Sequence, residues 1–407
     1  MCITMHTNET QLKQLRTQEI INDSFTPAFI QCERWDVPVA IVGARGYSGL
    51  ELARLLLKHP RANLTACFGN KDFSLADYLP EASATPTIPM DQMLSYVKEN
   101  QIRLIFLATP VEASLEWAPK LMQAGVSVVD LSGAFRLSQG NISENYQHWY
   151  KADHQAQDWV KNATYGLTAW TKNYSVVQGD ALVANPGCFA TAILTGLLPL
   201  LKENLIQADS LVIDAKSGTT GAGKKAEERL LYSEVEGQCL PYRIGQHQHL
   251  PEICQTVVRL TGVTIDPHFT THLINVRRGI IAGIYAKLDK NFGDELNNDQ
   301  DKNPSQVEKD QLATQKILEA FQKHYSEDHL IQVAALTPAN EAQILNLRRV
   351  VGSPRTQIGF KVVGGKLYLF SLIDNLMKGA ASQAVENFNQ LIGLPSWTGL
   401  QDVQGVL

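Results

Sequence analysis

One cysteine, Cys188, stands where the sequence could make a nucleophile. It follows the turn-forming run Asn185-Pro-Gly and precedes an apolar run, Phe189 to Leu201, that predicts a buried helix. We therefore expect Cys188 at a helix N-terminus, where free backbone N–H groups and the helix dipole favour a thiolate over a thiol. The alternative is a structural role for Cys188, because free cysteines are often buried and pack like small apolar side chains.

Two histidines, His247 and His249, could exchange a proton with this cysteine, since imidazole titrates near neutral pH. Side chains two residues apart point to opposite sides of an extended segment, so we expect only one of them to face Cys188. A structural, hydrogen-bonded role is one alternative. Metal binding together with Glu252 is another, and we expect no metal because the sequence shows no further ligand cluster.

A glycine-rich turn near residue 43 indicates a nucleotide site. The short apolar run Val39 to Val42 predicts a strand, and Leu50 to Leu57 has helical spacing. Between them the glycines would let the backbone approach a pyrophosphate at the helix N-terminus. The turn contains Gly43, Arg45, Gly46, Tyr47, Ser48 and Gly49. The glycine spacing is one residue off the usual dinucleotide fingerprint, so a plain strand-to-helix turn is the alternative.

The next expected strand, 64–68, ends in Gly69-Asn-Lys71 rather than in the acid that NAD enzymes present to the ribose 2′-hydroxyl. This end favours NADP(H) as the cofactor. Lys71 or Arg45 could pair with the 2′-phosphate, although Asp72 lies beside Lys71. Each of these basic residues could instead be an ordinary solvated charge.

Strands and helices then alternate, which predicts an α/β fold with a doubly wound, Rossmann-type sheet. Strands are expected at 102–107 and 126–129, with a helix over 113–124. Arg136 follows the second of these strands at the carboxyl end, where it could bind a phosphate or a carboxylate. The glycine-rich loop 216–223 follows a further strand, 211–214, and could offer N–H groups to a phosphate or to the nicotinamide carboxamide.

Composition excludes several classes of protein. The 407 residues carry a net charge of −5, without the basic surface of a nucleic-acid-binding protein. The six cysteines contain no Cys-x-x-Cys pair, which argues against a disulfide framework. No apolar run reaches the ~18 residues of a membrane span. We expect a cytoplasmic protein with neither nucleic acid nor membrane as a partner.

The chain divides into an extension and two domains. We expect an N-terminal extension at 1–36, a nucleotide-binding domain from 37–185 and 372–407, and an α+β catalytic and dimerisation domain at 186–371. Residues 291–310 are polar and predict an exposed insertion in the second domain.

A set of motifs in this order resembles the N-acetyl-gamma-glutamyl-phosphate reductases, which are similar in fold and mechanism to aspartate-semialdehyde dehydrogenases. The motifs are Gly43-Ala-Arg-Gly-Tyr-Ser-Gly, Ser132-Gly-Ala-Phe-Arg, Tyr165-Gly-Leu, Ala184-Asn-Pro-Gly-Cys, Asp214-Ala-Lys-Ser-Gly, His247-Gln-His, Pro251-Glu-Ile, Ile373-Asp-Asn-Leu and Lys378-Gly-Ala-Ala. The resemblance implies NADPH-dependent reduction of N-acetyl-L-glutamyl 5-phosphate to the 5-semialdehyde in arginine biosynthesis. It also implies a homodimer or homotetramer.

The resemblance assigns roles to residues of this chain. Cys188 would form a thioester, and His247 would be the acid/base because it aligns with the Gly-His of the dehydrogenases. Substrate-binding residues would be Arg136, Ser217 and Glu252. Beyond the first glycine turn and Lys71, cofactor-binding residues would be Thr109, Pro110, Ser132, Gly218, Gly221 and Asn375.

The sequence departs from the family pattern at two places. Ala134 stands where an acid is usual, and Thr168-Ala169 stands where Pro-Glu is usual. The identity of the substrate's acyl group therefore stays open. Aspartyl phosphate and a carrier-linked glutamyl or aminoadipyl phosphate are the alternative substrates. A non-catalytic dinucleotide-binding sensor is the alternative of another class, against which Cys188 and the His-x-His run argue.

Overall fold

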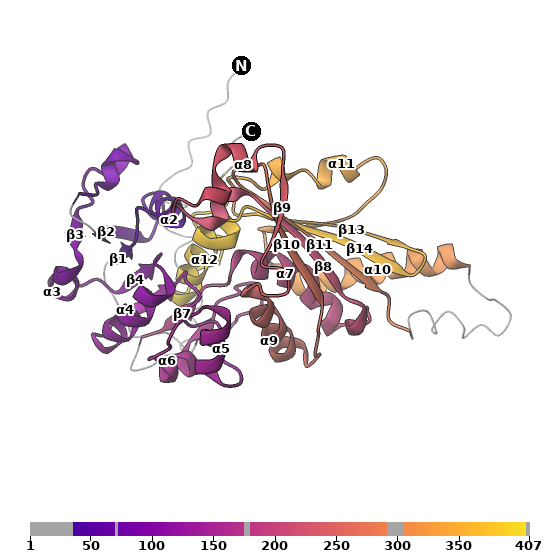
Figure 1. The fold of residues 1–407 in the computed structure, drawn as a ribbon, viewed down its shortest axis with the longest axis horizontal. Helices are drawn as coiled ribbons and strands as arrows, with labels where there is room; N and C mark the ends of the chain where they lie inside the picture. Colours follow the sequence, from indigo (N-terminus) through magenta and orange to yellow (C-terminus); the bar gives the residue numbers. More distant parts are fainter. Residues whose placement is uncertain (1–35, 70–71, 175–179, 291–304, 404–407) are drawn as a thin grey trace, which may run out of the picture.

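The computed structural model describes residues 36–69, 72–174, 180–290 and 305–403. They form two seven-stranded sheets, each with its own helices (Figure 1). The expected extension at 1–36, apart from Asp36, and Lys71 lie outside the described residues, as do 291–304.

The first sheet is parallel and carries the nucleotide-binding elements. Its strand order is β3-β2-β1-β4-β5-β7-β6. The strands are β1 (Val37–Val42), β2 (Ala62–Gly69), β3 (Thr87–Pro89), β4 (Leu104–Leu107), β5 (Ser127–Asp130), β6 (Thr164–Tyr165) and β7 (Leu182–Ala184). Its helices are α2 (Tyr47–Leu56), α3 (Met93–Glu99), α4 (Val111–Gln123), α5 (Ile142–Trp149) and α6 (Gln157–Asn162). The predicted α/β, doubly wound fold is confirmed.

The second sheet is mixed, in the order β12-β13-β14-β11-β8-β10-β9. Its strands are β8 (Val212–Ser217), β9 (Cys239–Tyr242), β10 (His268–Ile274), β11 (Ile280–Lys287), β12 (Ile331–Ala335), β13 (Thr356–Val363) and β14 (Lys366–Ile373). The helices of this part are α7 (Cys188–Lys202), α8 (Tyr232–Val235), α9 (His249–Thr261), α10 (Gln306–Tyr325) and α11 (Glu341–Ile344).

The core of this second part lies on one face of the sheet. In β8, Ile213 and Ala215 point into a cluster with residues of α7, α9 and α10, whereas Val212 on the alternate face is 41% exposed. Helix α7 is apolar nearly all round and is buried along its length, which is typical of a central core helix. This packing fixes the position of its first residue, Cys188.

The C-terminal helix, α12 (Ser382–Leu391), connects the two parts. It follows a π-helical turn, Met377–Ala381, and lies between the two sheets in Figure 1. The Phe388 ring packs edge-on against Phe106 of β4, with ring centroids 6.2 Å apart. The turn and helix thus bring C-terminal residues to the first sheet.

The last residues of the predicted insertion at 291–310 form the start of a helix. Ser305 caps α10: its hydroxyl accepts the Glu308 N–H, and the Glu308 carboxylate accepts the Ser305 N–H. This reciprocal capping box starts a 20-residue helix. The sequence carried the Ser-x-x-Glu signal, but the surrounding polar composition hid it.

Candidate active site

Cys188 is the first residue of α7, as predicted, and Gly187 is its N-cap. The C-terminal π-turn lies against it, since a Cβ atom on Gly379 would come 2.7 Å from the Cys188 Cβ. Two cavities meet at Cys188, and both are also lined by Gly221, Gln248 and His249. We call the larger cavity the cofactor cleft and the smaller one the acyl pocket.

The cofactor cleft has a volume of about 500 Å³ and lies at the carboxyl ends of β1, β4 and β5. Most of the predicted cofactor residues line it. They are Gly46, Tyr47, Ser48, Gly49, Thr109, Pro110, Ser132, Gly221 and Asn375. Arg136 lines the same cleft, beside Cys188. The topology therefore brings together side chains and turns from nearly the whole length of the chain.

Three predicted cofactor residues do not line the cleft. Gly43 has φ +85°, and a Cβ there would come 2.4 Å from the Ala108 carbonyl oxygen, so this glycine permits close packing of two turns. Gly218 packs in the same way against the backbone of Arg277 and Arg278. Arg45 is exposed on the first turn.

The acyl pocket has a volume of about 260 Å³. Ser217 and His247, two of the predicted site residues, line it. Sequence reasoning missed three other lining residues, Arg229, Tyr242 and Arg243. Arg243 has φ +48°, a conformation that costs energy for a side-chain-bearing residue and often accompanies function. Arg229 forms an ion pair with Glu227, a further lining residue, at 2.7 Å. Arg243 therefore gives the pocket its net positive charge, which suits an anionic substrate.

The two histidines lie side by side, so the expectation that they point apart is wrong. Gln248 between them has helical φ and ψ of −58° and −18°, because α9 begins at His249. The two rings are 4.8 Å apart. A Cβ on Gly187 would come 2.2 Å from the His249 Nε2, so this nitrogen lies against the residue that precedes Cys188.

Hydrogen bonding defines the tautomer of His247. The His249 backbone N–H donates to the His247 Nδ1 at 3.2 Å, so this nitrogen carries no proton. Burial, with the Arg243 charge, lowers the pKa of His247 to about 3, and burial lowers the pKa of His249 well below its usual range. Both imidazoles are therefore neutral, and His247 carries its proton on Nε2.

Glu252 lies beneath the site rather than in it. Its side chain is fully buried, and its Oε1 accepts the Gly187 N–H at 2.8 Å and the Tyr165 hydroxyl at 2.6 Å. Its Oε2 lies 3.6 Å from Nη1 of Arg136. The sequence predicted Glu252 as a substrate-binding residue, but its side chain lines neither cavity. It holds the turn before Cys188 instead.

Arg136 is also held firmly. Its Nε donates to the Asn185 carbonyl at 2.8 Å and its Nη2 to the Leu131 carbonyl at 2.9 Å. These bonds and the Glu252 carboxylate fix a buried guanidinium at the edge of the cofactor cleft. Because Nε and one Nη2 N–H already donate to carbonyls, the remaining Nη N–H groups are the ones that could donate to a phosphate or a carboxylate.

The expectation of a resting thiolate is not met in the free site. Burial raises the pKa of Cys188 to about 11, although the Arg136 charge and the Phe189 backbone N–H lower it. The carboxylate of Glu252 raises it further. The helix N-terminus therefore does act in the predicted direction, but desolvation outweighs it and Cys188 is a thiol at neutral pH.

The two departures from the family pattern lie outside both cavities. Ala134 is fully buried, and its carbonyl bonds to the His154 ring at 2.8 Å. Thr168 donates to Glu386 at 2.7 Å and accepts from Gln383 at 2.7 Å. Neither lines the cofactor cleft or the acyl pocket, nor does Ala169.

Within the described ranges, no group of three or more His, Cys, Asp or Glu side chains could hold a metal ion. No helix among the same residues is long and apolar enough to cross a membrane.

Comparisons with known proteins agree with this geometry. The family described as semialdehyde dehydrogenase, NAD binding domain, matches residues 38–176, and the semialdehyde dehydrogenase dimerisation domain matches 188–300. The chain is 37% identical to N-acetyl-gamma-glutamyl-phosphate reductase of Geobacillus kaustophilus, over 90% of this chain and 98% of that protein. The Brevibacillus brevis reductase is 37% identical, over 89% of this chain and 98% of that protein.

Solved structures show the same fold. Aspartate semialdehyde dehydrogenase II complexed with ASA, from Vibrio cholerae, has a TM-score of 0.59 at 15% identity, covering 88% of this chain and 99% of that one. A probable aspartate-semialdehyde dehydrogenase from Pseudomonas aeruginosa has a TM-score of 0.56 at 20% identity, with the same coverage. The resemblance stated from the motifs is confirmed, and the chain belongs to the N-acetyl-gamma-glutamyl-phosphate reductase family.

Proposed function

We propose that this enzyme reduces N-acetyl-L-glutamyl 5-phosphate with NADPH, giving N-acetyl-L-glutamate 5-semialdehyde and phosphate in arginine biosynthesis. Family membership supports this reaction. The observation that carries the proposal is the position of Cys188 at the junction of the two cavities. A nucleophile there can hold an acyl group in one cavity while a cofactor in the other reaches it.

Cys188 begins the reaction as a thiol, so it needs a base. We propose His249 for this role, since its neutral Nε2 lies against Gly187 and its ring lines both cavities with Cys188. The thiolate attacks the acyl carbon, phosphate leaves, and a thioester on Cys188 results. Hydride transfer to the thioester carbon then releases the aldehyde, and the thiolate recovers its proton.

In this proposal His249, rather than the predicted His247, is the acid/base, and His247 has a different role. His247 lines only the acyl pocket, and its Nε2–H can donate to a substrate oxygen there. Arg136 anchors the phosphate or a carboxylate from the cleft side, and Arg243 attracts the substrate carboxylate from the pocket side, where Arg229 is paired with Glu227. Ser217 is a further polar group in that pocket.

The cleft fits NADP(H), which supplies the hydride when bound. Helix α2 has neither a side-chain cap nor an acid in its first turn, so its N-terminal N–H groups are available to a pyrophosphate. Arg45 is exposed on the turn that leads into this helix and could pair with a 2′-phosphate. The same role for Lys71 stays a prediction, because Lys71 lies outside the described residues.

We propose the domain division as predicted, with 37–185 and 372–407 around the first sheet and 186–371 around the second. The family description of residues 188–300 is a dimerisation domain, which supports an oligomeric enzyme. We propose a homodimer or homotetramer assembled through the outer face of the second sheet, where Val212, Val363 and Tyr368 are exposed. A cytoplasmic location is proposed from the family alone.

The reverse reaction tests this function. Purified enzyme with NADP⁺, phosphate and N-acetylglutamate semialdehyde should give phosphate-dependent NADPH absorbance, and Cys188→Ser should give none. Aspartate semialdehyde and NAD⁺ serve as comparison substrates. Faster turnover of aspartate semialdehyde would assign the other acyl group, and absence of turnover with both aldehydes would favour the carrier-linked or non-catalytic alternatives.

A further inference from the structure

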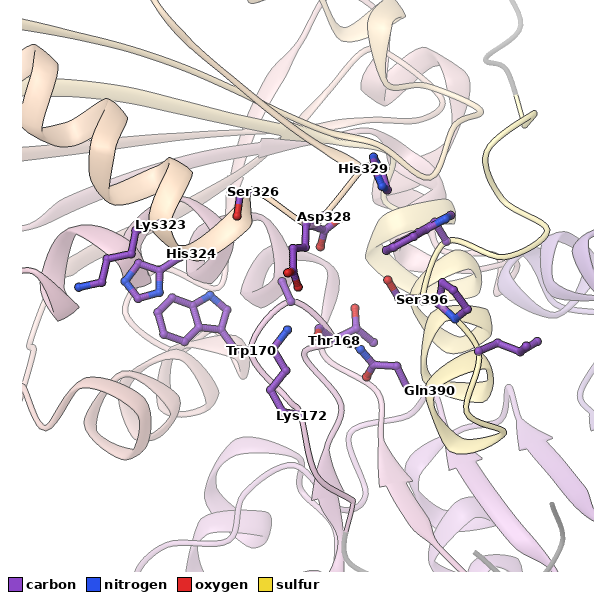
Figure 2. Close-up of a pocket in the computed structure, with 15 residues that line it drawn as sticks. Thr168, Trp170, Lys172, Lys323, His324, Ser326, Asp328, His329, Gln390 and Ser396 are labelled. Atoms are coloured by element: carbon purple, nitrogen blue, oxygen red, sulfur yellow. Dashed lines mark hydrogen bonds between the residues drawn. The ribbon is translucent and has the colours of Figure 1, made fainter. Parts of the chain in front are cut away.

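A third cavity, of about 930 Å³, shares no lining residue with the cofactor cleft or the acyl pocket. Three segments form it (Figure 2): 168–172, which follow β6; 323–329, which include the last residues of α10; and 390–397, which include the last residues of α12. We call it the Trp170 pocket. The proposed reaction leaves it without a role.

Three charged side chains of this pocket form no ion pair within the described residues, although Asp328 Oδ1 accepts the Leu330 N–H at 3.0 Å. Among the residues that the structure describes, no salt bridge joins Lys172, Glu327 or Asp328 to another side chain, and Figure 2 shows Lys172 and Asp328 directed into the same space. Lys323 is neutralised by Glu203 at 2.8 Å. Two carboxylates and one ammonium group are thus left for a ligand, which favours a ligand of net positive charge.

Aromatic rings complete the pocket. The Trp170 indole stacks on His324 with ring centroids 4.7 Å apart, and its Nε1 donates to the Tyr325 hydroxyl at 2.8 Å, which fixes the ring. Trp397 also lines the pocket, and its ring meets that of His329 in a T-shaped arrangement with centroids 4.4 Å apart. Indole faces attract cations, because their quadrupole is negative above the ring.

We propose that the Trp170 pocket binds a free amino acid with a cationic side chain. The ligand carboxylate pairs with Lys172, and its cationic groups pair with Asp328 and Glu327 and stack on indole. An amino acid of this class carries one negative and two positive charges, which matches the unpaired groups of the pocket.

Isothermal titration of the full chain with L-arginine and with L-lysine tests the proposal. We expect saturable binding of at least one of them, and binding of L-glutamate weaker by about tenfold or more. Asp328→Asn should weaken binding by about tenfold, because it removes a charge-assisted contact while an amide oxygen still accepts the Leu330 N–H. Lys172→Gln should weaken it similarly, and this exposed change leaves the fold intact.

Lys161→Gln, at an exposed lysine outside the pocket, is the matched control and should bind as the parent does. Cys188→Ser should also bind normally while losing turnover, so failure of the reductase proposal and failure of this one are distinguishable. Absence of saturable binding, equal binding of L-glutamate, or unchanged binding in both pocket variants of normal thermal stability would overturn the proposal.

Discussion

Replacing Glu252 by glutamine should make the protein less stable and yet make Cys188 more acidic. Glu252 is fully buried, and its carboxylate lies 3.6 Å from the Arg136 guanidinium. Removing one partner of a buried ion pair costs about 3–5 kcal/mol of unfolding free energy. The amide oxygen can still accept the Gly187 N–H and the Tyr165 hydroxyl, each worth about 1 kcal/mol, so the loss should lie near 3 kcal/mol.

The effect on Cys188 follows from the signs of the two charges. The Glu252 carboxylate raises the pKa of Cys188, and the Arg136 guanidinium lowers it. In Glu252→Gln only the cation remains, so the pKa of Cys188 should fall from its value of about 11. The thiolate fraction at a given pH rises accordingly, and alkylation by iodoacetamide becomes faster.

Two assays measure these effects: urea unfolding for stability, and alkylation of Cys188 against pH, read by mass spectrometry. Cys67 is the internal control, because it is fully buried in β2 and reacts only if the protein opens. Glu252→Leu keeps neither hydrogen bond and should lose about 5 kcal/mol. A pH profile of Cys188 alkylation that moves to higher pH in Glu252→Gln would refute the electrostatic reasoning.

Two further predictions concern other parts of the molecule. His249→Asn should lower kcat by about 10²–10⁴-fold, because it removes the acid/base group, whereas His247→Asn should mainly raise KM. Steady-state kinetics measure both, and the opposite pattern would assign the acid/base role to His247. Thr168→Val removes hydrogen bonds to Glu386 and Gln383 and should cost about 2 kcal/mol in urea unfolding with KM unchanged. Thr65→Val, at an exposed hydroxyl, is the control, and a raised KM in Thr168→Val would contradict its place outside the substrate cavity.

The sequence predicted the elements whose patterns are local. The apolar run after Cys188 and the strand, glycine turn and helix from Val37 to Leu56 depend on near neighbours, and the structure has both. The geometry of the histidines was missed because α9 begins at His249. Pro251 and Glu252, in the first turn of that helix, were a usable signal of a helix start.

Tertiary contacts explain the other differences. The protonation state of Cys188 depends on its burial beneath the π-helical turn Met377–Ala381, and no local sequence pattern reveals this contact. Arg229 lies in the 3-10 helical turn Glu228–Leu230 and Arg243 directly follows β9, and no sequence motif marks either of these pocket residues. The role of Glu252 as a support was hidden for the same reason, since its partners Tyr165 and Arg136 are far away in sequence.

The most direct test of the central claim, that Cys188 holds the acyl group beside the cofactor, is a single turnover without phosphate. N-acetylglutamate semialdehyde and NADP⁺ are mixed with the enzyme, NADPH absorbance is followed, and the protein is digested for mass spectrometry. We expect a burst of NADPH of about one equivalent per site, with the acyl group on Cys188, and release of that group when phosphate is added. A burst without acylation of Cys188, or acylation of a different residue, would contradict the account.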